Sequence, residues 1–334
     1  MTKKLLPILQ YLFFAALAAF FVWLSLRGLD DKKWAELLDA LRRAHYWMLV
    51  PVLLLLLLSN WLRALRWKQL MEPLGYNPSI FNVVLSVLIG YFVNLGAPRL
   101  GEVLKCTILA RYEKVPAEKL VGTIVAERAF DAICLAIVFG LAFIFQFDVL
   151  HSLVSTYIFP IFQNKSGHLS YQRIGLLLAL GLFFIIALKF ISERFAHVNI
   201  IQKIKNIVIG VWHGLISVKD LKNKPLFIFY SIAIWSLYLI STWVGFWAIT
   251  ETSHLNMADA LTVLAMGSIG MIVSPGGIGA YALLVQETVA FYNVAEQPYG
   301  QALGWILWLG QFLNFVIFGV ASFILLPRIN KKKS

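Results

Sequence analysis

Charge is the property that this sequence has least of. Only 14% of its 334 residues are Asp, Glu, Lys or Arg, and 60% are hydrophobic, which gives a mean hydropathy of +0.77. A soluble globular domain contains about 25% charged and about 45–50% apolar residues. The composition therefore excludes a water-soluble enzyme and a disordered or collagen-like chain. It predicts an integral membrane protein with several spans.

Patterns that bind metals or carry out catalysis are also scarce. The two cysteines, Cys106 and Cys134, show no paired spacing, and the six histidines show no metal-ligand spacing. The sequence has no nucleophile elbow and no phosphate-binding P-loop. We therefore predict that the chain is not an enzyme, that it uses no metal or other cofactor, and that it does not itself drive transport with ATP.

Long apolar runs are what the sequence has in abundance. A helix needs about 20 apolar residues to cross the hydrocarbon core of a membrane, where every backbone polar group must be paired within the protein. Six runs are long enough to be full spans: 5–26, 46–65, 121–147, 173–192, 226–250 and 300–326.

Two further apolar stretches, 80–98 and 258–274, end in a proline with glycine nearby, at Pro98 and Pro275. The residue before proline avoids the helical region, and glycine tolerates unusual dihedral angles. We interpret each break as the tip of a re-entrant hairpin. The two hairpins would cover 80–112 and 258–293. The alternative is eight kinked spans, but this would expose the charged second arm of the first hairpin to lipid.

The order of these parts repeats. Each half of the chain contains a span, an amphipathic piece, a span, a hairpin and a final span, and the amphipathic pieces cover 30–44 and 199–220. Three crossings in each half is an odd number, so the second half must be inverted relative to the first. The predicted fold is an all-α membrane protein with two inverted halves, 1–150 and 151–334. Secondary transporters commonly use this plan.

The basic residues predict an orientation. The formal net charge is +12, and most of the 29 Lys and Arg residues fall on the side that holds both termini, while none falls between 251 and 299. The positive-inside rule then places both termini in the cytoplasm of what we expect to be a bacterial inner membrane. The first hairpin would enter from the cytoplasm and the second from outside. No soluble basic module is present to bind nucleic acid, so the excess charge indicates topology and attraction to anionic lipid headgroups.

The span 121–147 contains three charged residues, Glu127, Arg128 and Asp131. On a helix they lie within an arc of about 100°, so they share one face. Charges at this depth are costly against lipid and are expected to face the protein interior or water. They are either a neutralised triad that holds helices together or a polar wall of a transport path. Two carboxylates against one arginine also leave a surplus negative charge, which requires a basic partner.

The first hairpin is the expected source of that partner. If its second arm is helical, Arg99, Glu102 and Lys105 share one face, and Arg99 or Lys105 would meet the acids of span 121–147. The first turn of this arm also presents unpaired amide groups and the positive end of a helix dipole. These features suit a phosphate or another anion.

The second hairpin repeats this logic without charge. Ser274 is placed to cap a helix, and Pro275 to occupy its first turn. The glycines either let the backbone approach a ligand or serve close helix packing, which is equally common in membranes. The candidate binding residues of this hairpin are Pro275, Gly276, Gly277, Gly279, Gln286 and Glu287.

Three basic residues, Arg63, Arg66 and Lys68, lie at the end of the span 46–65. Long basic side chains at the end of a span usually extend to the membrane surface. We therefore expect an interfacial belt, and the alternative is an electrostatic entrance for lipid headgroups.

Several of these motifs together resemble a known family. The motifs are Arg99-Leu100-Gly101-Glu102, then Glu127-Arg128-x-x-Asp131, and Pro275-Gly276-Gly277-Ile278-Gly279, with Arg-x-x-Arg-Trp-Lys at 63–68. Over about 5–326 the sequence is similar to the flippase-like transmembrane domain of lysylphosphatidylglycerol synthases, here as a standalone member without the synthase domain. Members of that family often have a glutamate at the position of Ala282, and Glu287 is the candidate replacement.

The resemblance implies that the protein moves a lipid between membrane leaflets, without aminoacyl transfer. The cargo would be an amphipathic lipid with an anionic or phosphate-bearing headgroup. An ion-coupled carrier of a small soluble anion and a non-transporting subunit of a lipid-modifying enzyme are the alternatives. A second copy of the chain and a separate lipid-modifying enzyme are the protein partners that stay open.

Overall fold

The fold is all-helical in a computed structural model, which describes residues 2–97, 99–163, 170–171, 175–176 and 221–331. These residues form helices and no β-strand. Within these described residues, four helical segments are long and apolar enough to cross a membrane, and there are five if a bent pair near the N-terminus is one span. The prediction of an all-α membrane protein is confirmed at this level. The expected span 173–192 and the amphipathic piece 199–220 lie almost wholly outside the described residues.

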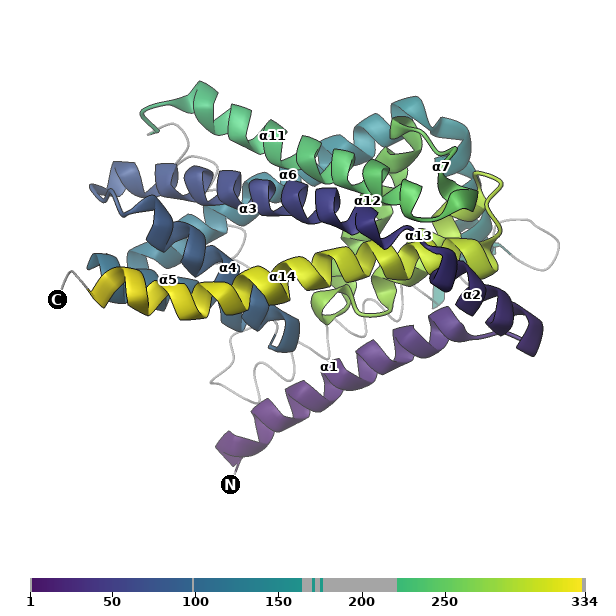
Figure 1. Cartoon of the computed structure of the whole chain (residues 1–334), viewed down its shortest axis with the longest axis horizontal. Helices are drawn as coiled ribbons and strands as arrows, with labels where there is room; N and C mark the ends of the chain where they lie inside the picture. Colours follow the sequence, from purple (N-terminus) through teal and green to yellow (C-terminus); the bar gives the residue numbers. More distant parts are fainter. Residues whose placement is uncertain (1, 98, 164–169, 172–174, 177–220, 332–334) are drawn as a thin grey trace.

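The four long helices correspond to four predicted spans. They are α3 (Leu49–Met71), α6 (Ala117–Phe145), α11 (Lys224–Gly245) and α14 (Gln301–Asn330). α3 packs along α11, and α14 runs the length of the molecule beside α3 and both hairpins (Figure 1). Two short helices, α7 (Phe147–Leu153) and α8 (Phe159–Phe162), follow α6.

The expected first span forms α1 (Thr2–Leu26), which lies at the edge of the bundle (Figure 1). It is followed by the amphipathic helix α2 (Asp31–Arg43), and the two meet at an angle of 102°. Asp30 caps α2 by accepting a hydrogen bond from the Lys33 amide at 2.8 Å. The apolar side of α2 is buried at Leu37 and Ala40 in the same core cluster as α13 and α14.

Each interrupted apolar stretch forms a pair of packed helices. The first pair is α4 (Ile80–Gly96) with α5 (Leu100–Glu113), and the second is α12 (Met257–Val273) with α13 (Ala280–Ala290). At 17 residues, α4 and α12 are each about 25 Å long, shorter than a full span. Small residues allow the arms to meet closely. A Cβ added to Gly101 would lie 1.9 Å from the Gly90 carbonyl oxygen, so only glycine fits there.

The two helix pairs lie toward opposite ends of α14 (Figure 1). Leu85 and Ile89 of α4 pack with Leu326 near the end of α14, whereas α13 packs with the beginning of α14. Their tips meet in the middle of the molecule, where a Cβ added to Gly276 would lie 3.0 Å from Leu95 Cδ2. The arrangement resembles two hairpins that approach each other from opposite sides.

Candidate functional site

A cluster of buried charges joins α3, α5 and α6. Glu127 is fully buried and accepts a hydrogen bond from Arg63 Nη1 at 3.0 Å and another from Lys105 Nζ at 2.8 Å. One turn along α6, Asp131 accepts from Arg63 and, at 2.5 Å, from Arg66 Nη2. Charge pairs of this kind offset the cost of burying each ion, and removing one partner leaves the other uncompensated.

The arginines of this cluster correct one sequence-based expectation. Arg63 and Arg66 do not reach the membrane surface, because their side chains are only 5% and 0% exposed and point at the acids of α6. Arg66 also donates to Ser231 of α11 at 3.1 Å. The interfacial belt is therefore wrong for these two residues, and α3 continues as a helix six residues beyond the predicted end of the span. Lys68, the third residue of that group, is half-buried.

The expected basic partner from the first hairpin is Lys105. Its ammonium group reaches Glu127 and also lies 4.5 Å from the centre of the Trp67 ring. Arg99, the other candidate, is exposed and has a positive φ of 67° at the start of α5. The first turn of α5 is also partly occupied, since the Gly101 amide donates to Asn94 Oδ1 at 2.9 Å.

A second ion pair links α5 to α6, and here α5 supplies the anion and α6 the cation, the reverse of the pair between Lys105 and Glu127. Arg128 Nε of α6 lies 3.0 Å from Glu102 Oε1 of α5, and both side chains are partly exposed. The cluster thus contains three carboxylates, Glu102, Glu127 and Asp131, and four cations, Arg63, Arg66, Lys105 and Arg128. The surplus charge is positive, whereas the three residues of α6 alone predicted a negative surplus.

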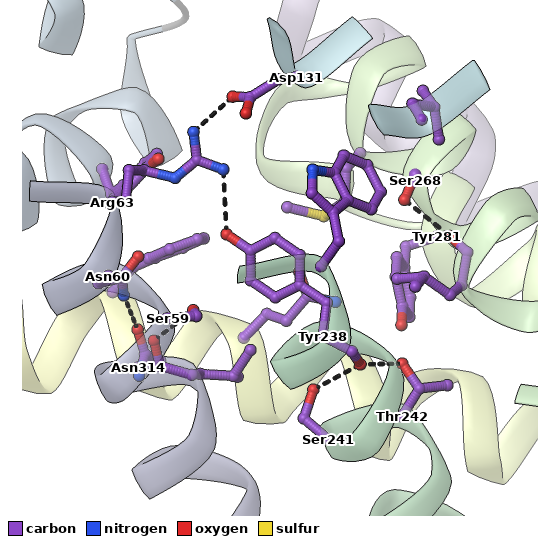
Figure 2. Close-up of a pocket in the computed structure, with 18 of the residues that line it drawn as sticks. Ser59, Asn60, Arg63, Asp131, Tyr238, Ser241, Thr242, Ser268, Tyr281 and Asn314 are labelled. Carbon is purple, nitrogen blue, oxygen red and sulfur yellow. Dashed lines mark hydrogen bonds and ion pairs between the residues drawn. The ribbon is translucent and has the colours of Figure 1, made fainter. Parts of the chain in front are cut away.

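A pocket of about 380 Å³ lies beside this cluster. Its walls come from α3, α4, α6, α11, α12, α13 and α14, and most of the wall is apolar, for example at Val52, Leu264 and Leu307. Arg63, Arg128 and Asp131 line one part of it, and Arg63 Nη2 donates to the Tyr238 hydroxyl at 3.2 Å. Figure 2 shows the Arg63 guanidinium between Asp131 and Tyr238.

Neutral polar side chains form a further part of the pocket lining. The buried Asn60 of α3 donates to Asn314 Oδ1 of α14 at 2.8 Å, and Figure 2 shows this amide pair below Arg63. The other neutral polar side chains of the lining are Ser59, Tyr91, Tyr238, Ser241, Thr242, Ser268, Tyr281 and Gln311. Sequence analysis missed these residues. Two amides inside apolar runs, at 60 and 314, were the signal that would have indicated a buried polar site.

The glycine-rich tip of the second hairpin lies outside the described lining of this pocket. Pro275–Gly277 form one 3₁₀ turn, and Gly276, Gly277 and Gly279 all have positive φ. The tip packs closely on α1, since a Cβ added to Gly279 would lie 2.4 Å from the Val22 amide nitrogen. Ser274 donates to the Ile278 carbonyl at 3.0 Å, and its side chain makes no capping hydrogen bond to the amides of the turn that follows.

The polar residues farther along α13 belong to other contacts. The buried Gln286 accepts a hydrogen bond from Ser25 of α1 at 3.1 Å, so it connects α1 to the hairpin. Glu287 is half-buried and is not among the described lining residues. Ala282, the position at which the family often has glutamate, is fully buried, and a Cβ added to Gly304 would lie 2.5 Å from its carbonyl oxygen. A glutamate side chain has no room there without repacking of α13 against α14. Among the described residues, no group of three His, Cys, Asp or Glu side chains is arranged to hold a metal ion.

Comparisons with known proteins agree that the chain is a membrane protein. The chain is 23% identical to the UPF0104 membrane protein MJ1595 of Methanocaldococcus jannaschii over 345 aligned positions, which cover 99% of this chain and 97% of that protein. No solved structure matches. The family described as the lysylphosphatidylglycerol synthase TM region matches residues 8–321. This chain is therefore a membrane protein of the lysylphosphatidylglycerol synthase TM-region family.

Proposed function

We propose that this protein moves an amphipathic lipid with an anionic, phosphate-bearing headgroup between the leaflets of a membrane. One observation carries the proposal. A mostly apolar pocket of about 380 Å³ has paired arginines at one part of its wall, beside a charge cluster with a positive surplus. Guanidinium groups bind phosphate through strong charge-assisted hydrogen bonds.

The pocket also reaches the outer surface of the bundle. Ile272 of α12 lines the pocket although it is 72% exposed, and Ala132 of α6 is likewise a lining residue and exposed. The Arg128 side chain, 41% exposed, lies near the same opening. An apolar lateral opening suits a lipid, because the headgroup can enter the pocket while the acyl chains stay in the bilayer. A carrier of a small soluble anion needs a closed polar cavity instead.

The arrangement of the hairpins suggests how the headgroup would pass. We propose the six-span topology with two inverted halves, 1–150 and 151–334, in which the hairpins enter from opposite faces and meet tip to tip. Transporters of this plan expose a central site to each side in turn by moving one half against the other. The proposed orientation places both termini in the cytoplasm of a bacterial inner membrane.

The predicted site residues then have different proposed roles. Arg63 and Arg128 contact the headgroup, and the carboxylates of Glu102, Glu127 and Asp131 hold these two arginines in place, while Lys105 pairs with Glu127. Arg66 anchors Asp131 from the side of α3, and Lys68 and the exposed Arg99 lie outside the pocket lining. Pro275 and the glycines position the second hairpin.

Leaflet exchange of a fluorescent lipid tests the proposal. The protein is reconstituted in phosphatidylcholine vesicles that contain a trace of fluorescent phosphatidylglycerol, and exchange is followed by quenching from outside. We expect the native protein to accelerate exchange. Arg128→Gln should slow it at least tenfold, because one charge-assisted hydrogen bond contributes about 1.5–3 kcal/mol.

Arg42→Gln is the matched control, since Arg42 is an exposed arginine of α2 outside the pocket. Exchange no faster than in protein-free vesicles would overturn the proposal. Uptake of inorganic phosphate by the same vesicles would favour the soluble-anion carrier.

A further inference from the structure

We propose that the headgroup this pocket accepts is a phosphate joined to a neutral polyol, such as glycerol or a single sugar-like ring, and not an aminoacylated cationic headgroup. The inference rests on the proposed function, because it names the chemical class of the lipid that the same pocket would take. It follows from the charges, the hydrogen-bonding capacity and the size of the pocket.

The charges of the lining disfavour a cationic headgroup. Asp131 is the one carboxylate among the described lining residues, and both Arg63 and Arg66 already bind it. An ammonium group that entered would meet Arg63 and Arg128 without finding a free carboxylate. A phosphate would meet the same two guanidinium groups, which are also ion-paired, with Glu127, Asp131 and Glu102, so the positive surplus of the cluster is what favours an anion.

The hydroxyl groups of the lining are prepared to accept hydrogen bonds. Ser241 and Thr242 both donate to the Tyr238 carbonyl, at 2.8 and 3.0 Å, and Ser268 donates to the Leu264 carbonyl at 2.7 Å. Figure 2 shows these three hydroxyls directed to backbone oxygens. A hydroxyl that has donated its one hydrogen presents lone pairs to a ligand, so it accepts from a ligand O–H or N–H group.

Two buried donors of the lining residues lack a partner in the described part of the chain. They are Trp235 Nε1 and Arg63 Nε. Buried donors without partners are costly, and both are closed to solvent here, so a ligand oxygen pairs with them only once the Trp235 or Arg63 side chain turns toward the pocket. A polyol hydroxyl both donates and accepts, so it can pair with the serine oxygens and with these donors. An ammonium group only donates and leaves the indole and guanidinium N–H groups unpaired.

The volume sets an upper limit on the headgroup. About 380 Å³ lies near the lower end of the range of about 300–1,000 Å³ that is usual for small-molecule pockets. A phosphate joined to a glycerol or to a single ring is small enough for this volume, whereas a long oligosaccharide would extend beyond the pocket walls.

A comparison of headgroups tests the inference with the native protein. Phosphatidylcholine vesicles receive trace fluorescent phosphatidylglycerol, phosphatidylinositol or lysyl-phosphatidylglycerol, and leaflet exchange is measured for each. We expect phosphatidylglycerol or phosphatidylinositol to exchange at least tenfold faster than the lysyl lipid. Comparison of the first two lipids shows whether the pocket prefers an open-chain polyol or a ring. A lysyl lipid that exchanges as fast as both would overturn the inference and leave the proposed function intact. Failure of all three lipids to exchange would overturn the proposed function itself.

Removal of pocket hydroxyls provides a second test. In the double variant Ser241→Ala, Ser268→Ala, exchange of phosphatidylglycerol should fall about tenfold, the effect of losing one to two hydrogen bonds, while exchange of phosphatidic acid stays the same. Phosphatidic acid has the phosphate without the polyol. Ser322→Ala is the matched control, because Ser322 is also buried and donates to a carbonyl of its own helix, at 2.6 Å, but does not line the pocket. A phosphatidylglycerol rate that stays at the native value, or a fall of equal size for the two lipids, would overturn the inference.

Discussion

Glu127 is the residue whose neutralisation should weaken the fold most clearly. It is fully buried, and each of its two carboxylate oxygens pairs with a different cation, Arg63 at 3.0 Å and Lys105 at 2.8 Å. In Glu127→Gln the side chain keeps its shape but loses its charge, and its amide N–H₂ group then faces a cation. The positive surplus of the cluster rises from one to two. Loss of one partner from a buried pair costs about 3–5 kcal/mol.

Unfolding by SDS in mixed micelles, followed by tryptophan fluorescence, measures this cost as a change in the apparent free energy of unfolding. The control is the double variant Glu127→Gln, Lys105→Met, which restores the native surplus charge and leaves no unpaired ammonium group. We expect the double variant to regain more than half of the free energy of unfolding that Glu127→Gln loses. A double-mutant cycle that includes Lys105→Met alone reports this as a coupling energy between the two residues. A cost below about 1 kcal/mol for Glu127→Gln would refute the reasoning. So would a double variant whose cost equals the sum of the costs of Glu127→Gln and Lys105→Met.

Two further predictions concern the hairpins. Gly101→Ala should prevent the close contact of α5 with Gly90 of α4 and destabilise the protein by several kcal/mol in the same assay. The control is Gly122→Ala, which should be neutral or stabilising because no atom lies within 4 Å of the added Cβ. Similar effects of the two changes would contradict the packing of α5 on α4. In a background without the native cysteines, Asn77→Cys before α4 and Ser253→Cys before α12 should react with an impermeant maleimide from opposite faces of the membrane. Labelling of both from one face would rule out the proposed inverted hairpins.

The broad fold was predictable because lipid permits few structures. Apolar runs of about 20 residues had to be helices, and the four long helices described by the structure follow the predicted spans closely. Proline and glycine also predicted the breaks at the two hairpins, where the residues on each side form packed helix pairs. The bend between α1 and α2 could not be predicted in the same way, because hydropathy does not indicate the angle between consecutive helices.

The sequence predicted the site only where charged residues interrupt an apolar run. Charged residues inside an apolar run must be paired, so Glu127, Asp131 and the partner of Glu127, Lys105, could be identified from the spacing of charges on two predicted helices. Arg63 and Arg66 were assigned to the membrane surface because the apolar run ends near them. Which partner an arginine meets depends on how α3 packs on α6, and this information is not local in the sequence.

Neutral pocket residues were missed for a different reason. Serine and threonine are common in apolar helices, where they donate to a carbonyl one turn earlier and need no other partner. Ser241, Thr242 and Ser268 all do this. Their placement on one pocket wall depends on the packing of α11 and α12.

The two ion pairs between α5 and α6 have opposite polarity, with Glu102 facing Arg128 and Lys105 facing Glu127. Because α5 presents one anion and one cation to α6, a shift of the first hairpin along the membrane normal transfers no net charge from these two residues. A transmembrane voltage of 100 mV changes the energy of one displaced elementary charge by about 2.3 kcal/mol, but here the two contributions cancel. Rocking of this hairpin would thus be insensitive to membrane potential as far as these side chains are concerned, and a gradient of voltage alone would not power it through them.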